Sequence, residues 1–236
     1  MSGSTGGIMA SCNHAAQALL RADPDTAMSK YRFIVSTEIY TVGTIGGRCL
    51  LRCEPVNGDV YRLTAKQGHG DWFYPYINGT DGGVGVCVVP IGQPEGTLVV
   101  TGGMNGCALQ VNRSANNFYF YHDLNGRSLQ GKLTPGDVVC RVEYKDYAGP
   151  LDLARKMAED SGGRGYSFWG ATYKNAMHEN YLITVRRGGR WKVYISAVLR
   201  ISSTTIGWLD KQSSTTVSFK PVSPLVTPLI TSFEDA

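Results

Sequence analysis

The chain has 236 residues, of which 42% are apolar and 18% charged, and its formal net charge is +4. A chain of this length buries a core large enough to fold without disulfides or a structural metal. Its lysines and arginines are spread along the sequence, which excludes the long basic stripe with interleaved aromatic residues that is typical of nucleic-acid-binding proteins.

The first residues show no basic start followed by an apolar stretch, so no secretory signal is visible, and no run reaches the length of a transmembrane helix. Residues 1–27 are predicted to be a flexible leader with one short helix near residues 14–20. Residues 28–236 are predicted to form a single domain, because no linker divides them.

From Tyr31 onward the sequence is dominated by short β-rich runs separated by glycine and asparagine turns. One helix is predicted over residues 150–160, where a proline opens the segment and a glycine follows its end. The pattern predicts a mainly β (α+β) fold, a β-sandwich flanked by one or two helices. The predicted strands lie near residues 31–42, 48–56, 59–65, 82–92, 96–103, 106–112, 117–123, 138–147, 166–173, 180–202 and 215–222.

The cysteines form no CxxC pair, and the spacing of cysteines and histidines matches no zinc site. Most of the six cysteines lie in apolar runs and are predicted to be buried small hydrophobic residues. They are Cys12, Cys49, Cys53, Cys87, Cys107 and Cys140. Three histidines belong to no recognisable motif and are predicted to lie on the surface: His14, His69 and His178.

The densest basic group straddles a pair of glycines between two strand-like runs, which predicts the tip of a β-hairpin. A solvated hairpin explains these charges without a nucleic-acid partner. The group consists of Arg186, Arg187, Arg190 and Lys192 around Gly188 and Gly189.

Residues 101–123 combine a tight turn, a cysteine and a histidine at strand-like spacing. The turn at Asn105 and Gly106 leads to Cys107, and a later strand carries His122. In a hairpin, Cys107 and His122 would lie near each other across the strand pair. The alternative is a structural cysteine in the core, beside a histidine by coincidence.

A nucleophilic thiol has a chemical reason to need such neighbours. A nearby imidazole takes its proton and can return that proton to a leaving amine. Backbone N–H groups around the Asn105-Gly106 turn are candidates for holding an oxyanion. A third group must fix the tautomer of the imidazole.

This segment resembles the catalytic core of the family that contains the Burkholderia lethal factor and the cytotoxic necrotizing factors. The family has a Ser-Gly-Cys turn after a hydrophobic strand and a histidine on a following strand. Here the turn reads Asn105-Gly106-Cys107, with asparagine in place of serine, and the histidine is His122. Thr101 stands six residues before the cysteine, at the offset of the lethal factor's threonine, whose main-chain oxygen orients the histidine.

The resemblance implies a β-sandwich flanked by helices and a toxin or effector that deamidates a specific glutamine of a host protein. Cys107 would attack the amide carbon, His122 would protonate the departing ammonia, and water would hydrolyse the thioester to leave glutamate. No metal or cofactor is needed. The expected protein is a monomeric virulence factor, secreted without a classical signal peptide or delivered into the host cytosol.

The resemblance also implies that the carbonyl of Thr101 holds the second ring nitrogen of His122. Asp123 looks like the acid of a catalytic triad, but adjacent side chains of a strand point to opposite faces. We therefore expect Asp123 to face away from the ring and to start the turn at residues 124–126.

Two other functions use features of the same sequence. The aromatic residues at 72–76 favour a carbohydrate-binding β-sandwich module, unless Trp72 and Tyr74 wall the catalytic cleft or simply pack a loop over the sandwich. A transglutaminase would use the same Cys107–His122 pair but pass the acyl group to an amine. A protease is least favoured, because no papain-type cysteine signature is present.

Overall fold

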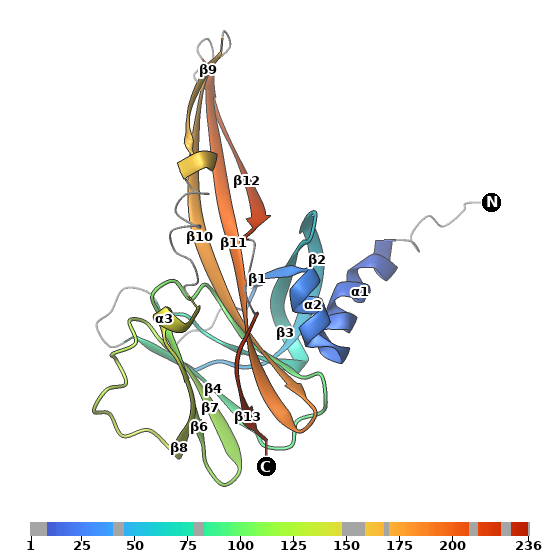
Figure 1. Cartoon of the computed structure of the whole chain (residues 1–236), viewed down its shortest axis with the longest axis vertical. Helices are drawn as coiled ribbons and strands as arrows, with labels where there is room; N and C mark the ends of the chain where they lie inside the picture. Colours follow the sequence, from blue (N-terminus) through green and yellow to red (C-terminus); the bar gives the residue numbers. More distant parts are fainter. Residues whose placement is uncertain are drawn as a thin grey trace, which may run out of the picture.

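The structure, a computed structural model, describes residues 9–39, 45–77, 83–147, 159–167, 170–207, 212–222 and 228–235. Within these ranges, a nine-stranded sheet packs against a four-stranded sheet, and two helices cover the outer face of the larger sheet (Figure 1). The predicted mainly β sandwich flanked by helices is confirmed.

The helices are α1 (Met9–Ala22), α2 (Pro24–Lys30) and the single turn α3 (Tyr144–Tyr147). The small sheet has the order β4-β7-β6-β8 and consists of β4 (Val84–Pro90), β7 (Asn117–Asp123), β6 (Ala108–Arg113) and β8 (Asp137–Val142). The large sheet consists of β1 (Arg32–Thr37), β2 (Gly47–Asn57), β3 (Val60–Tyr74), β5 (Leu98–Thr101), β9 (Gly163–Ser167), β10 (Gly170–Arg187), β11 (Arg190–Gly207), β12 (Ser213–Pro221) and β13 (Leu229–Glu234).

Alternating side chains of facing strands fill the space between the two sheets. Phe118 and Phe120 of β7 meet Trp191 of β11 there, with ring centroids 6.2 and 5.8 Å from the Trp191 ring in edge-on geometry. The alternation follows from strand geometry, which sends every second side chain to the same face. Each fully buried side chain of this size contributes about 1.5–3 kcal/mol through removal from water.

Part of the N-terminal segment packs on the fold, so the prediction of a flexible leader over residues 1–27 is wrong from residue 16 onward, whereas the short helix predicted near residues 14–20 lies within α1. Leu20 of α1 and Met28 of α2 are fully buried in a second apolar cluster on the outer face of the large sheet. The guanidinium of Arg21 binds both carboxylate oxygens of Asp71, a buried residue of β3. The sequence alone does not predict that these helices pack on the sheet, because the contacts join residues far apart in the chain.

The glycine-centred hairpin joins β10 to β11, as predicted. Gly188 and Gly189 have φ angles of 64° and 72°, the left-handed pair that a two-residue turn of this kind requires. Glu95 accepts from both of their N–H groups and pairs with Arg186. The neighbouring basic residues also have carboxylate partners: Arg190 pairs with Glu234 and Lys192 with Asp25. The basic group is therefore largely neutralised.

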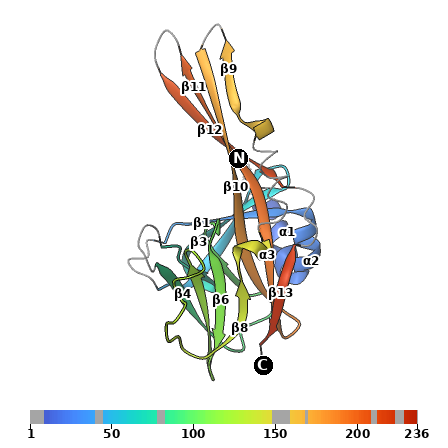
Figure 2. The same cartoon turned by 60° about the vertical axis from the view of Figure 1, so that its left-hand side comes forward.

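Four strand segments extend beyond the sandwich as a projecting sheet, which we call the arm (Figures 1 and 2). The arm consists of residues 163–167 of β9, 170–177 of β10, 200–207 of β11 and 213–219 of β12, in that order across the sheet. Both β10 and β11 are 18 residues long and run continuously from the sandwich into the arm.

The structure also bears on the predictions made for the cysteines and for the helix at residues 150–160. Five cysteines are free and buried, as predicted, and the side chain of Cys12 lies outside the described residues. The helix predicted over residues 150–160 also lies outside them, apart from residues 159 and 160, which are helical. Among the described residues, no helix is long and apolar enough to cross a membrane.

Candidate active site

Cys107 and His122 come from neighbouring segments of the small sheet. Cys107 directly precedes β6, and Leu109 of β6 pairs with His122 of β7. Cys107 lies two residues before Leu109, just outside the strand, and both residues belong to the cluster between the sheets. Cys107 and His122 are both buried, with 2% and 1% exposure.

The ring of His122 is held by Thr101, which lies across the sandwich on β5. Oγ1 of Thr101 is 2.8 Å from Nδ1 of His122 and donates to the carbonyl of Tyr74 at 2.8 Å. A hydroxyl has one proton to give, and a carbonyl can only accept. The Thr101 hydroxyl donates its proton to the Tyr74 carbonyl. Nδ1 of His122 therefore carries the ring proton and donates to the Thr101 oxygen. Nε2 is then left with its lone pair.

This contact corrects the role expected of Thr101. The resemblance implied that its carbonyl orients the ring, whereas the hydroxyl stands at Nδ1. The reason is geometric: Thr101 pairs in parallel register with Tyr74 of β3, so the carbonyls of β5 lie in the plane of the sheet. Side chains stand roughly perpendicular to that plane and reach the opposite sheet.

Nε2 of His122 is buried and has no hydrogen-bond partner among the described residues. Cys107 and His122 are therefore not joined by a hydrogen bond in this structure. Burial raises the pKa of the Cys107 thiol to about 12 and lowers the pKa of His122 to about 4, while Asp123 nearby raises both. The resting pair consists of a neutral thiol and a neutral imidazole, rather than the thiolate that the sequence suggested.

The turn before Cys107 is anchored to β10 by Asn105. The N–H of Cys107 donates to the carbonyl of Met104 at 3.0 Å, and Gly106 has a φ of 84° that favours glycine. Nδ2 of Asn105 donates to the carbonyl of His178 at 3.0 Å, and its Oδ1 accepts from the N–H of Asn180 at 3.0 Å. These bonds use the Cys107 N–H and one of the two Nδ2–H donors of Asn105, so the Cys107 N–H is not free for the expected oxyanion role.

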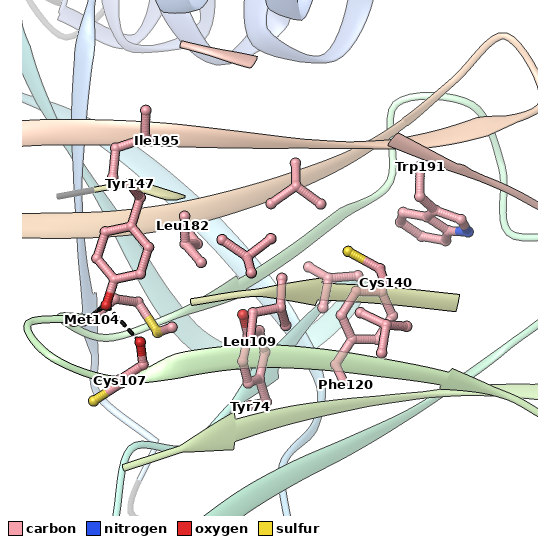
Figure 3. Close-up of a cluster of buried hydrophobic side chains, with 14 of the residues drawn as sticks. Tyr74, Met104, Cys107, Leu109, Phe120, Cys140, Tyr147, Leu182, Trp191 and Ile195 are labelled. Atoms are coloured by element: carbon pink, nitrogen blue, oxygen red, sulfur yellow. Dashed lines mark hydrogen bonds between the residues drawn. The ribbon is translucent and has the colours of Figure 1, made fainter. Parts of the chain in front are cut away.

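Tyr147 of α3 holds the same turn from its other side. Its hydroxyl donates to the carbonyl of Met104 and lies 2.7 Å from the carbonyl of Cys107. Figure 3 shows the Tyr147 ring above these two residues, with the Cys107 sulfur at the margin of the cluster and pointing away from its other labelled side chains. The backbone on both sides of Asn105 and Gly106 is thereby fixed.

Asp123 does not touch the His122 ring, as expected for adjacent residues of one strand. Oδ1 of Asp123 accepts from the N–H of Ser128 at 3.0 Å, and Oδ2 accepts from the N–H of Leu129 at 3.3 Å. The carboxylate is fully buried and caps the turn that follows β7. The hydrogen bonds among these residues therefore orient the His122 ring through a hydroxyl and give it no carboxylate partner.

An open hollow of about 360 Å³ is lined by Gly106, Cys107 and Ala108, at the end of the turn before β6; this turn, residues 104–107, is called the nucleophile turn after the role proposed below for Cys107. Arg127, Gln130 and Lys145 contribute hydrogen-bond donors to its wall. Glu143 also lines it and is already paired with Arg141 and Lys145. A polar side chain of another molecule therefore finds more donors than free acceptors here. The full lining is Gly106, Cys107, Ala108, Asn125, Gly126, Arg127, Gln130, Glu143, Tyr144 and Lys145.

Of the aromatic residues at 72–76, Trp72 and Tyr74 lie in the core, and Tyr76 lies at the candidate site. Trp72 is 6% exposed and Tyr74 is fully buried, so the prediction that they wall a cleft is wrong, and neither is available to stack on a sugar. They lie inside because β3 continues through them into the sandwich. Tyr76, just beyond the strand, lies against the His122 ring with ring centroids 5.1 Å apart, and Tyr74 contacts the same ring edge-on at 6.2 Å.

A glycine opposite His122 makes room for this aromatic cover. Gly85 of β4 pairs with His122 of β7. A Cβ at Gly85 would lie 1.8 Å from the carbonyl oxygen of Pro75, closer than any real contact. The chain that carries Tyr76 can therefore pass over the histidine only because position 85 has no side chain.

Several residues of the site escaped the sequence-based prediction. Tyr147 lies forty residues after Cys107 and has no motif around it. His178 was expected on the surface but is half-buried, and burial lowers its pKa. His69 is exposed as predicted, and the side chain of His14 lies outside the described residues.

In the part of the chain that the structure describes, no group of three or more His, Cys, Asp or Glu residues is arranged to hold a metal ion. A scan against protein-family models finds no match to this sequence, and a search of curated proteins also finds none. The function is therefore inferred from the geometry of the site.

Proposed function

We propose that this chain is a cysteine hydrolase of side-chain amides, a protein-glutamine deamidase of the toxin or effector type. The observation that carries the proposal is the hydrogen bond from Nδ1 of His122 to Thr101, which leaves the lone pair of Nε2 on the side of the ring away from Thr101. A buried imidazole held in one tautomer, on the strand that pairs with the segment after Cys107, and a cysteine that lines an open hollow supply the base and the thiol that nucleophilic catalysis uses.

The reaction begins when the Cys107 thiol attacks the amide carbon of a bound glutamine while Nε2 of His122 takes the thiol proton. The tetrahedral intermediate collapses as the imidazolium returns that proton to the departing ammonia. A thioester then joins Cys107 to the substrate. Water, deprotonated by Nε2, attacks the thioester, and the thiol is regenerated with glutamate as product. One amide and one water give one carboxylic acid and one ammonia.

In the resting pair the imidazole is neutral, because a base with a pKa near 4 is unprotonated at neutral pH, and it has a lone pair to accept the thiol proton. The high pKa of the thiol opposes early proton transfer, so the mechanism requires the proton to move together with attack on the substrate carbonyl. Developing negative charge on the amide oxygen meets the donors of the hollow, with Arg127 and Lys145 as the cations among its lining residues.

The proposal is tested by treating a eukaryotic cell lysate with purified protein and mapping peptides for glutamine-to-glutamate changes. Wild type should produce a specific change together with ammonia, and Cys107→Ser and His122→Gln should produce neither. The matched control is Cys140→Ser, because Cys140 is another buried cysteine of the same cluster. Conversion that persists in correctly folded Cys107→Ser would refute the proposal.

The same experiment separates hydrolysis from acyl transfer. Methylamine added to the lysate competes with water for the thioester. A deamidase yields glutamate as its main product, whereas a transglutaminase yields methylamide at the same glutamine. Methylamide as the main product would assign the Cys107–His122 pair to a transglutaminase.

A further inference from the structure

The arm has two chemically different faces. Directly paired residues of antiparallel strands share a face, and so do alternate residues of one strand. The register therefore assigns every described side chain of the arm to one side or the other. One side continues the face that packs against the small sheet, and the other continues the face that packs against α1 and α2.

The side that continues the inter-sheet face carries small and hydroxyl-bearing residues along its outer part. Thr172 and Thr205 form a cross-strand hydroxyl pair at 3.1 Å on this side. None of the exposed large hydrophobic residues that the structure describes lies on it. We call it the hydroxyl face. Its described residues are Thr172, Lys174, Ala176, Ser203, Thr205, Ser214, Thr216 and Ser218.

The opposite side, which we call the apolar face, holds all the exposed large hydrophobic residues described on the arm. They come from three adjacent strands: Tyr173 (38% exposed), Met177 (48%), Ile206 (40%) and Val217 (45%). Arg164 of β9 stacks on the Tyr173 ring at 5.5 Å from the same side. These exposed apolar side chains do not pack into the core, because the arm projects beyond the sandwich that contains the core (Figure 2).

A hollow of about 430 Å³ lies at the base of the apolar face, where the arm meets β1, β2 and β3. Two guanidinium groups, Arg62 and Arg200, line it against one carboxylate, Glu179. Glu179 already accepts from the Tyr181 hydroxyl at 2.7 Å and lies 3.6 Å from Arg200. The charge that remains for a partner is therefore positive. The apolar part of the lining is Ile34, Val35, Val56, Val217 and Phe219.

We propose that the apolar face of the arm and the hollow at its base bind an acidic segment of a partner protein that also carries apolar side chains. Tyr, Met and Arg are the residue types enriched where proteins meet. Ser202, Thr204 and Thr215 interrupt the apolar residues on the same face, giving the mixed polarity of a protein interface. Carboxylates of the partner complement Arg62, Arg164 and Arg200.

The binding proposed for the arm is separate from the chemistry proposed for Cys107, but strand β10 contacts both regions. Met177 of the apolar face directly precedes His178, whose carbonyl accepts from Asn105 of the nucleophile turn. The apolar face continues the α1/α2 side of the large sheet, so the two sites lie on opposite sides of β10. Binding is measured without turnover, so its outcome does not depend on the deamidase proposal.

The test uses fluorescence anisotropy with a labelled peptide in which glutamate alternates with tyrosine and leucine. A second peptide carries lysine in place of glutamate, and vesicles of phosphatidylcholine and phosphatidylserine form a third probe. We expect the full chain to bind the acidic peptide at least about tenfold more tightly than the basic one, with weaker attachment to vesicles.

Two variants locate the binding surface. Tyr173→Ser with Val217→Ser changes the apolar face, and Lys174→Ala with Thr216→Ala changes the hydroxyl face as the matched control. The first should weaken binding of the acidic peptide about tenfold or more, and the second should change it less than about threefold. Circular dichroism and thermal melts confirm that each variant is folded. Equal effects of the two variants, equal binding of both peptides or preferential binding to vesicles would overturn the proposal.

Discussion

Oγ1 of Thr101 stands 2.8 Å from Nδ1 of His122 and at the same distance from the Tyr74 carbonyl oxygen, so it accepts from the first and donates to the second. The relationship joins β5 of the large sheet to β7 of the small sheet. It makes the orientation of a single imidazole depend on the packing of both sheets.

Thr101→Val replaces the hydroxyl by a methyl group of similar volume and should lower the turnover of Cys107 by roughly 5–150-fold, because a buried N–H left unpaired costs about 1–3 kcal/mol. Thr101→Ser keeps the oxygen and should retain most activity. Nitrogen NMR of His122 provides the direct readout: wild type should show a protonated Nδ1 and a bare Nε2. Wild-type activity in Thr101→Val would contradict this role of the hydroxyl.

Asp123→Asn should reduce stability while leaving the chemistry intact. The amide oxygen still accepts one backbone N–H, but the second acceptor is lost from a buried site. We expect a loss of about 1–3 kcal/mol in the free energy of unfolding and a Cys107 alkylation rate within about threefold of wild type. If Asp123→Asn instead abolished activity in a folded protein, as His122→Gln is expected to do, a carboxylate triad would be operating.

Tyr147→Phe tests whether the nucleophile turn must be held from its second side. Without the hydroxyl, the Met104 and Cys107 carbonyls lose their shared partner, and the thiol is positioned less well. Turnover should fall roughly tenfold, with the substrate KM little changed. Tyr119→Phe is the matched control and should behave as wild type, because Tyr119 alternates with the buried Phe118 and Phe120 and so lies on the outer face of β7.

Gly85→Ala should displace the chain that covers His122, because the new Cβ meets the Pro75 carbonyl. We expect a loss of about 1–3 kcal/mol in stability and a change in the proton shifts of the His122 ring as Tyr76 moves away. Gly47→Ala serves as the control, since a Cβ there would meet nothing within 4 Å. Unchanged His122 shifts in Gly85→Ala would show that Tyr76 does not depend on this glycine.

The buried His122 also predicts how stability depends on pH. Its pKa falls from 6.5 to about 4 on folding, so the unfolded chain binds the extra proton first as the solution is acidified. The stabilisation of the folded state by neutral His122 is fully present above pH 6.5 and is lost as the pH falls through about 4. It amounts to roughly 3 kcal/mol at most in the free energy of unfolding. Denaturant titrations from pH 7 to 4 should show this slope in wild type and less of it in His122→Leu.

Labelling with iodoacetamide tests access to the nucleophile. Burial raises the pKa of Cys107 to about 12, so its rate at neutral pH should be lower than that of free cysteine and should rise above pH 9. Cys107 lines the open hollow, so it should still react before Cys49, Cys53, Cys87 and Cys140. Labelling of Cys87 ahead of Cys107 in the folded protein would contradict the assignment of the hollow as the entrance.

The sequence was informative where local rules decide the structure. Alternating strand patterns predicted the sandwich, and the glycine pair at 188–189 predicted its hairpin. Adjacency on one strand predicted that Asp123 turns away from the His122 ring. Each of these follows from the period of a strand or the φ angles of a turn.

It was uninformative where contacts join distant segments. The hydroxyl of Thr101 at Nδ1, the hydroxyl of Tyr147 at the Cys107 turn and the bond between Arg21 and Asp71 span 21, 40 and 50 residues. No local pattern encodes a pairing over such a separation. Trp72 and Tyr74 were misplaced for a related reason, because only the position of the small sheet shows that the end of β3 is covered.

The three strands that build the His122 site lie far apart in the chain, so the site exists only in the folded protein. Tyr74, Thr101 and His122 meet only after β3, β5 and β7 have found their places in two different sheets. A nascent or incompletely folded chain therefore carries an ordinary cysteine at position 107, with no imidazole held beside it. Catalytic activity and native structure should therefore appear together on refolding, whereas the thiol should become less reactive toward alkylating reagents as the sandwich closes around it.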